Sequence, residues 1–201
     1  PPRDGLPDGV FQRFVPNLML WGGHKFDLRV FATLDPASGE PFAFRTAAVR
    51  VAQRPFDAGC QEGDVQMTHY SGMMPTTRWP QWPEAMPAVH AAVAAVMKAF
   101  RPCIGPGPGP WSVLWGVDVA LGAGLRPYVL EVNTAPELTY GEKFPHWQGV
   151  VDGMLDDFLQ HFVVPFLLAY PPPLDPLAPR GGWVAADAAA DGGGLPPSVV
   201  Q

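Results

Sequence analysis

The sequence has 201 residues, a formal net charge of −6, 47% hydrophobic residues and 16% charged residues, which suits a globular protein with one well-filled core. The acidic balance argues against a nucleic-acid-binding surface, and no apolar run is long enough to cross a membrane. Two cysteines, Cys60 and Cys103, form neither a disulfide framework nor a metal-binding spacing, which favours a reducing compartment.

Two short segments near the N-terminus are predicted to be strands. The first covers residues 10–15 and lies between a glycine and a proline. The second, residues 25–30, alternates strictly, so Lys25, Asp27 and Arg29 share one face and the apolar residues share the other. The same alternation is typical of an ordinary solvated strand and of a strand beside a binding site. The pattern alone leaves these two interpretations equal.

Residues 31–34 and 42–49, joined by a turn at 35–40, are predicted to form a hairpin. Arg45 lies in its second arm and is either an exposed strand arginine or a site residue. The following stretch, residues 52–85, has little pattern. It contains His69, and a lone histidine in a loop is more often a surface residue than a ligand.

Two amphipathic helices are expected, at residues 86–100 and at about 147–166. In the first, valines and Met97 form the apolar stripe, and His90 lies on a flank. Between this helix and the next strand, residues 101–110 read as a Pro/Gly linker. It is not a phosphate-binding loop, because alternate prolines remove the backbone N–H groups that such a loop uses.

The most informative stretch runs from Trp111 to Pro136 and is predicted to be an antiparallel hairpin. Asp118 lies on its first arm. Glu131 and Asn133 lie two residues apart on its second arm and therefore share a face. Two carboxylates and an amide oxygen are ligands that Mg²⁺ prefers. The alternative interpretation is that these acids line the solvated face of a half-buried hairpin.

These motifs resemble two regions of the tubulin–tyrosine ligase-like family, which has the ATP-grasp fold. The run Glu131-Val132-Asn133-Thr134-Ala135-Pro136, preceded by Gly116-Val117-Asp118, resembles the metal-binding end of that family. The run Gln12-Arg13-Phe14-Val15, followed by Lys25-Phe26-Asp27-Leu28-Arg29, is similar to the family in order and spacing.

The resemblance implies an α+β fold over residues 1–170. It would be the C-terminal lobe of an ATP-grasp domain, an antiparallel sheet with packed helices, whose N-terminal lobes are missing from this sequence. The first residue is not methionine, and we expect the chain to be a piece of a longer protein. Residues 171–201 are rich in Pro, Gly and Ala, and we expect a disordered tail there.

The resemblance also implies a role for individual residues. The residues implied to bind ATP are Gln12, Arg13, Phe14, Val15, Lys25, Asp27, Thr68 and His69, and those implied to bind Mg²⁺ are Asp118, Glu131 and Asn133. Lys25 and Arg29 are implied to stabilise the transferred phosphoryl group, and Arg45 to hold the carboxylate of an incoming amino acid. At residues 66–69 the chain has Gln-Met-Thr-His where the family carries His-Leu-Thr-Asn.

The implied activity is ATP-dependent ligation of a free amino acid (tyrosine, glutamate or glycine) to the C-terminal tail of tubulin through an acyl phosphate. The corresponding location is the cytoplasm, on the microtubule cytoskeleton or in a cilium or flagellum. The alternatives are an ATP-grasp carboxylate–amine ligase with another substrate, a non-catalytic ATP- or tubulin-binding relative, and a plain structural domain. A non-catalytic relative would be expected to lose the metal ligands, and this chain keeps Asp118, Glu131 and Asn133.

Overall fold

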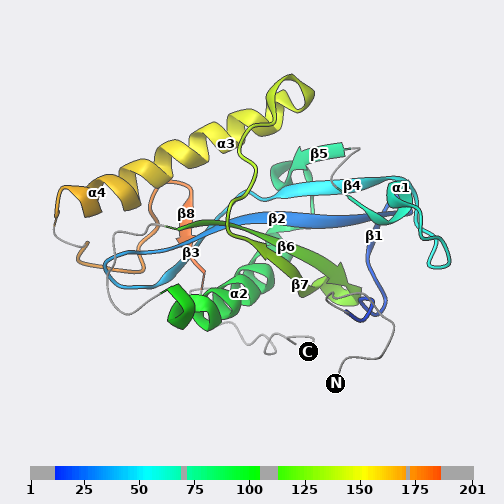
Figure 1. The fold of residues 1–201 in the computed structure, drawn as a ribbon, viewed down its shortest axis with the longest axis horizontal. Helices are drawn as coiled ribbons and strands as arrows, with labels where there is room; N and C mark the ends of the chain where they lie inside the picture. Colours follow the sequence, from blue (N-terminus) through cyan, green and yellow to red (C-terminus); the bar gives the residue numbers. More distant parts are fainter. Residues whose placement is uncertain (1–11, 69–71, 105–112, 171–172, 187–201) are drawn as a thin grey trace, which may run out of the picture.

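The computed structural model describes residues 12–68, 72–104, 113–170 and 173–186 (Figure 1). The strands in these ranges are β1 (Leu20–Trp21), β2 (His24–Leu34), β3 (Pro41–Phe44), β4 (Ala48–Pro55), β5 (Gly72–Pro75), β6 (Leu114–Gly122), β7 (Arg126–Asn133) and β8 (Trp183–Ala185). The helices are α1 (Gly63–Gln66), α2 (Trp82–Phe100), α3 (Pro145–Phe158) and α4 (Val164–Leu167), with a π-helical turn at Leu159–Val163 between the last two. None of the helices in these ranges is long and apolar enough to cross a membrane.

The strands form one antiparallel sheet centred on β2. One edge of β2 pairs with β6, which in turn pairs with β7. The other edge pairs with β3 and β4, and these continue outward to β8 and β5 respectively. The predicted α+β class, an antiparallel sheet with packed helices, is therefore confirmed.

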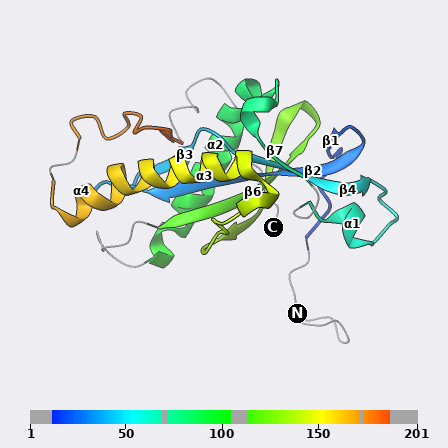
Figure 2. The same cartoon turned by 90° about the horizontal axis from the view of Figure 1, so that it is seen from above.

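Helices cover both faces of this sheet, as Figure 1 shows. Because successive side chains of β2 point to opposite faces, Phe26, Leu28 and Val30 pack toward α2 in one hydrophobic core. Phe31 lies on the other face and packs in a second core with α3, where its ring stacks on Trp147. Seen from above, α3 and α4 lie over the β3 end of the sheet (Figure 2). The remaining part of that face holds the cleft described below.

The predicted hairpin after β2 is interrupted where one continuous arm was expected. Ala32 pairs with Ala43 and Arg29 pairs with Ala48, so two residues of β2 face four residues of the opposite arm. The extra residues form a break at 45–47. The Arg45 N–H donates to the Gly182 carbonyl, and the Arg45 carbonyl accepts from Trp82 Nε1 of α2. The break therefore satisfies its backbone groups outside the sheet.

The predicted strand at residues 10–15 is wrong over its described part, because residues 12–15 are not in a strand. The N-terminal pairing begins later. Leu18 forms a bridge with Gly122, the Met19 N–H donates to the Leu121 carbonyl, and β1 then pairs with the start of β2. Residues 12–15 instead run along the edge of the cleft described below.

The C-terminal segment is the second correction. Residues 173–186 were predicted to be part of a disordered tail, but they fold back, and β8 pairs with β3. Arg180 donates to both Asp35 oxygens at 3.0 and 3.2 Å, and its guanidinium lies 4.7 Å from the Phe42 ring centroid. Trp183 is completely buried. The burial of one tryptophan and one paired arginine orders a segment of otherwise low-hydrophobicity composition. Residues 171–172 and 187–201 lie outside the described residues.

Both predicted helices are confirmed, with α2 beginning four residues earlier than expected and the second helix running as α3, the π turn and α4. The side chain of His90 differs from the prediction. It was expected on a flank, but it is only 2% exposed and packs against Trp82. Of the predicted linker at residues 101–110, the first part, Arg101–Ile104, forms a 3-10 turn that continues α2, and residues 105–110 lie outside the described residues.

The burial of His90 leads to a testable pH dependence. Burial lowers the pKa of His90 from its usual 6.5 to about 4, because the charged imidazolium is poorly solvated in the core. The unfolded chain therefore binds a proton that the folded chain rejects, and stability falls as the pH decreases from 6.5 toward 4. We expect a loss of about 2 kcal/mol between pH 7 and pH 5. Denaturant unfolding at both pH values measures it.

The control is His90→Leu, which removes the titrating group from the same site. The pH-dependent loss of unfolding free energy in this variant should be smaller by the amount assigned to His90. Identical pH dependence in the two proteins would contradict the assignment.

Candidate functional site

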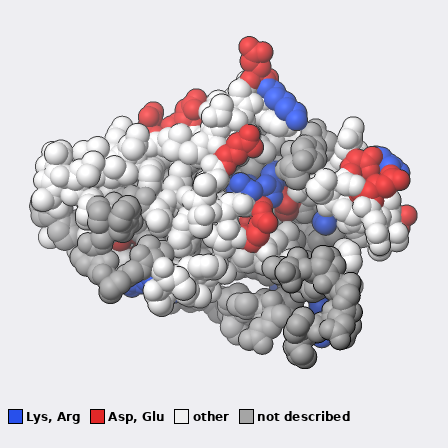
Figure 3. All heavy atoms as spheres, in the orientation of Figure 1, with Lys and Arg blue, Asp and Glu red and all other residues white. Residues whose placement is uncertain are grey.

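The face of the sheet that α3 leaves uncovered holds a cleft of about 850 Å³. Figure 3 shows basic and acidic side chains next to one another near the centre of this face. The residues that line the cleft come from the segment before β1, from β2, β4, β6 and β7, and from the loops after α1 and β7. Among them are Gln12, Arg13, Phe14, Val15, Lys25, Asp27, Arg29, Arg50, Thr68, Asp118, Glu131 and Asn133.

The strand register brings the charged residues of this cleft together. On one edge of β2, Asp27 pairs with Arg50 of β4, and on the other edge Arg29 pairs with Asp118 of β6. Asp118 also pairs with Glu131 of β7. Directly opposed residues of antiparallel strands point to the same face, so these five side chains gather on one side of the sheet. The predicted shared faces of β2 and of the β6–β7 hairpin are thus one and the same face.

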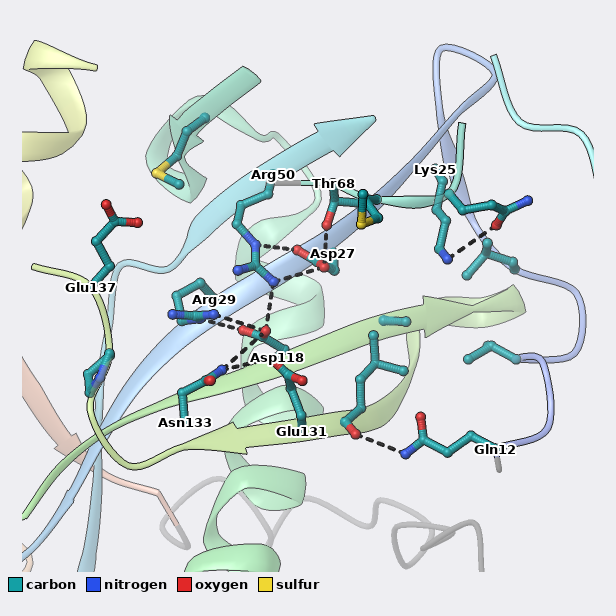
Figure 4. A pocket seen from close by; sticks show the side chains of 18 of the residues that line it. Gln12, Lys25, Asp27, Arg29, Arg50, Thr68, Asp118, Glu131, Asn133 and Glu137 are labelled. Atoms are coloured by element: carbon teal, nitrogen blue, oxygen red, sulfur yellow. Dashed lines mark hydrogen bonds and ion pairs between the residues drawn. The ribbon is translucent and has the colours of Figure 1, made fainter. Parts of the chain in front are cut away.

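Figure 4 shows the hydrogen bonds and ion pairs that connect four of these side chains, Asp27, Arg29, Arg50 and Asp118. Arg29 donates two hydrogen bonds to the Asp118 carboxylate, from Nε to Oδ1 and from Nη2 to Oδ2, the latter 3.0 Å long. Arg50 grips Asp27 in the same way, with bonds of 2.6 and 2.9 Å. Its Nη2 also lies 2.9 Å from Asp118 Oδ2, and Thr68 Oγ1 donates to Asp27 Oδ2 at 2.5 Å. The result is one continuous network of two guanidiniums and two carboxylates.

The four groups of this network are buried: Asp27, Arg29, Arg50 and Asp118 are between 4% and 8% exposed. Burial by itself raises the pKa of Asp118, but the hydrogen bond from Arg29 and the charge of Arg50 outweigh it, so the pKa of this carboxyl lies below its usual value. Burial lowers the pKa of Arg50, and its bond to Asp27 reverses this and raises it. Both groups are therefore charged at neutral pH, and each depends on its partners.

Lys25 lies on the same face of β2, nearer its start, and is less well paired. Its Nζ lies 3.4 Å from Gln66 Oε1, at the long limit of a hydrogen bond. Burial lowers the pKa of Lys25, and the charge of Asp27 offsets only part of this effect. A partly desolvated ammonium with a long hydrogen bond can gain a strong interaction from an anion that enters the cleft.

The three predicted metal ligands lie together. Asn133 Nδ2 is 2.8 Å from Glu131 Oε1 and 3.5 Å from Asp118 Oδ2. Glu131 is exposed to the cleft, and its carboxylate together with the Asn133 amide oxygen matches the oxygen ligands of Mg²⁺. Both oxygens of Asp118, however, face guanidinium groups. Among the described residues no three His, Cys, Asp or Glu side chains are arranged to hold a metal ion. The donor types fit Mg²⁺, while Asp118 is held by its two arginines.

The predicted nucleotide-binding segment occupies one end of the cleft. Gln12, Arg13, Phe14 and Val15 all line it, and Gln12 Nε2 donates to the Leu130 carbonyl at 3.0 Å. Thr68 also lines it, beside Asp27. His69 lies outside the described residues.

Arg45 is the predicted site residue that the structure does not bring to the cleft. It is exposed, lies in the break between β3 and β4, and is absent from the lining. Its carbonyl accepts a hydrogen bond from Trp82 of α2, on the opposite side of the sheet from α3. The expectation that Arg45 shares the cleft with Arg29 and Glu131 is therefore wrong. The break at 45–47 is the physical reason, because it takes this residue out of the strand pairing.

Arg50 is the site residue that sequence reasoning missed. Had the β2–β3 register continued without a break, Asp27 would face Ala48. The break at 45–47 inserts two extra residues, which shift the β4 residue opposite Asp27 from position 48 to position 50. Because the shift is an even number, the β4 side chains still point to the same faces of the sheet, and Asp27 faces Arg50. The sequence contains one hint, because Arg50 lies between two valines in an otherwise apolar stretch. It contains nothing that predicts the break.

Comparisons of the sequence with protein-family models and with curated proteins found no match.

Proposed function

We propose that this chain carries the ATP- and Mg²⁺-binding lobe of an ATP-grasp carboxylate–amine ligase of the tubulin–tyrosine ligase-like kind. One observation carries the proposal. The two motifs that resemble this family are far apart in the sequence, with Arg29 and Asp118 separated by 89 positions, yet both line one cleft and are hydrogen-bonded to each other. An unrelated structural domain would have no reason to bring these two motifs into contact.

The size and lining of the cleft suit a nucleotide. Its volume of about 850 Å³ lies within the range of roughly 300–1,000 Å³ found for small-molecule sites. Phe14, Val15, Leu18 and Leu130 supply apolar surface for a planar base, and Gln12 adds an amide beside them. Lys25 and Arg29 lie on β2 and Arg50 lies on the neighbouring strand β4, so we place the phosphates over β2.

In the proposed reaction, an oxygen of an acceptor carboxylate attacks the γ-phosphorus of ATP, ADP leaves, and an acyl phosphate forms. The amine of the incoming amino acid then attacks the acyl carbon and displaces phosphate, which yields an amide. Lys25 and Arg29 stabilise the negative charge on the transferred phosphoryl group. Mg²⁺, held by Glu131, Asn133 and Asp118, would neutralise charge on the nucleotide phosphates.

The proposed acceptor is the C-terminal tail of tubulin, and the proposed donor is free tyrosine, glutamate or glycine. This places the protein in the cytoplasm, on microtubules or in a cilium or flagellum. The position of Arg45 changes one part of the proposal, namely the group that binds the carboxylate of the amino acid. Because Arg45 does not line the cleft, the carboxylate of the amino acid must be held by another group.

The test uses the full-length protein with ATP, Mg²⁺ and tubulin, supplied in turn with labelled tyrosine, glutamate and glycine. We expect one of them to be incorporated, with one ADP released per amino acid. Lys25→Gln should weaken ATP binding at least ten-fold, because it removes the partly desolvated ammonium. Arg78→Gln, which removes an exposed positive charge outside the cleft, is the control. Failure of the wild-type protein to bind ATP would overturn the proposal.

A second candidate function is a non-catalytic ATP- or tubulin-binding relative. Two observations favour it: Asp118 is engaged by two arginines, and Arg45 is absent from the cleft. The same assay separates the two candidates. Saturable ATP binding without amino-acid incorporation or ADP release would establish the non-catalytic function.

A further inference from the structure

The carboxylate of Asp118 is occupied on both oxygens by positive groups. Arg29 Nε donates to Oδ1, and Arg29 Nη2 and Arg50 Nη2 lie 3.0 and 2.9 Å from Oδ2. Asn133 Nδ2 adds a fourth N–H group, 3.5 Å from Oδ2. Asp118 is only 4% exposed. A metal ion needs space and a lone pair at a carboxylate oxygen, and in this arrangement a guanidinium nitrogen lies against each of the two oxygens of Asp118.

The two arginines also oppose a cation at Asp118 itself. Within the buried network, Asp27 and Asp118 are balanced by Arg29 and Arg50, so the excess negative charge that could attract a cation lies on Glu131 and not on Asp118. A divalent ion bound to Asp118 at about 2.1 Å would lie against two guanidiniums. The repulsion in this buried site is far stronger than at an exposed one.

We propose that Arg29 and Arg50 block Asp118 against divalent cations, and that a polyphosphate opens the site by giving Arg29 a competing partner. The two arginines differ in the hydrogen bonds that they keep when they release Asp118. When Arg50 releases Asp118 it keeps both of its hydrogen bonds to Asp27, and so remains paired. Arg29 donates to Asp118 from two nitrogens, so an anion in the cleft must replace those bonds. Cation and polyphosphate therefore bind with positive coupling, which by reciprocity acts equally on both.

This inference rests on the proposed nucleotide site, but its first test needs no nucleotide. Binding of Mn²⁺ alone is measured by electron paramagnetic resonance of free Mn²⁺, in wild type, Arg29→Gln, Arg50→Gln and the control Arg78→Gln. We expect Arg29→Gln to bind Mn²⁺ at least ten-fold more tightly than wild type, because it frees Oδ1 of Asp118 and removes a positive charge. Arg50→Gln also removes a positive charge but leaves Arg29 on both oxygens, so its gain should be present but smaller. Arg78→Gln should match wild type, since Arg78 does not line the cleft.

A double variant identifies the ligand. Adding Asp118→Asn to Arg29→Gln should abolish the gain in Mn²⁺ affinity, and circular dichroism checks that each protein is folded. Equal Mn²⁺ affinity in all folded variants, or a gain that persists without Asp118, would overturn the proposal. Should either single variant not fold, the other one tests the same block.

The coupling itself is measured in the wild-type protein. The protein should bind the Mn²⁺ complex of a non-hydrolysable ATP analogue at least ten-fold more tightly than it binds the same analogue without metal, measured in EDTA. Absence of analogue binding would refute the proposed function and leave the Mn²⁺ result on the variants standing. Analogue binding that does not depend on metal would refute the coupling alone.

Discussion

Asp118→Asn is expected to lower the free energy of unfolding by about 3 kcal/mol, since removing one partner of a buried ion pair leaves an uncompensated charge. The substitution keeps the volume of the side chain and removes its charge. Arg50 keeps Asp27 as a partner, but the Arg29 guanidinium, 8% exposed, loses the carboxylate to which it donates two hydrogen bonds. Urea unfolding at pH 7 measures the difference from wild type.

The control for this experiment is Glu62→Gln, which removes a carboxylate partner of the exposed Arg54. An exposed ion pair contributes less than about 1 kcal/mol, so this variant should stay close to wild type. The double variant Arg29→Met with Asp118→Leu should recover much of the loss, because it leaves no unpaired charge on either side of the pair. Equal destabilisation by Asp118→Asn and Glu62→Gln would contradict the buried network.

The pH dependence of the Asp118 effect has a defined sign. The pKa of Asp118 is lowered in the folded protein, so its ionised form stabilises the fold above the usual value of 3.8. This contribution is lost as the pH falls through the lower folded pKa. The difference in unfolding free energy between wild type and Asp118→Asn should therefore be constant near neutrality and shrink below pH 3.8.

Glu131→Gln is expected to reduce ligation at least 100-fold and to leave the unfolding free energy unchanged. Glu131 is exposed to the cleft, and the glutamine carbonyl can still accept the hydrogen bond from Asn133 Nδ2, so the fold loses little. The charge that would help to hold Mg²⁺ is lost, and loss of a metal ligand costs at least the 10–100-fold typical of the groups that support one. Amino-acid incorporation and urea unfolding are measured on the same preparation.

Glu142→Gln is the matched control, because Glu142 is also an exposed glutamate but does not line the cleft. Its incorporation rate should equal that of wild type. A Glu131→Gln protein with wild-type incorporation would remove Glu131 from the metal site. A Glu131→Gln protein that is inactive and also unstable would assign the residue to the fold instead.

The two-residue period of strands made the polar faces predictable. Lys25, Asp27 and Arg29 alternate with apolar residues, and Glu131 lies two positions from Asn133. Because side chains of a strand point alternately to its two sides, such spacings determine a shared face whatever the rest of the chain does. Helical spacing predicted α2 and α3 in the same way. These features depend on neighbours in the sequence alone.

The C-terminal segment shows where composition misleads. Residues 173–186 are poor in large apolar side chains, and composition predicts disorder. Trp183 nevertheless lies in the core, and Arg180 lies between Asp35 and the rings of Phe42 and Phe162. These contacts and the pairing of β8 with β3 join the segment to residues far away in the sequence, such as Asp35, which is 145 positions from Arg180. The average composition of a segment does not reveal individual contacts of this kind.

The sequence by itself determined the strand faces, the two long helices and the polar faces that Lys25, Asp27 and Arg29 share on one strand and Glu131 and Asn133 on another. Only the tertiary structure decided which charges meet. The break at 45–47 moves Arg50 opposite Asp27 and takes Arg45 away from the cleft, and the β2–β6 pairing places Arg29 on Asp118. The physical reason is that side-chain direction follows from local backbone geometry, whereas pairing depends on register, and register is set by packing across the whole sheet.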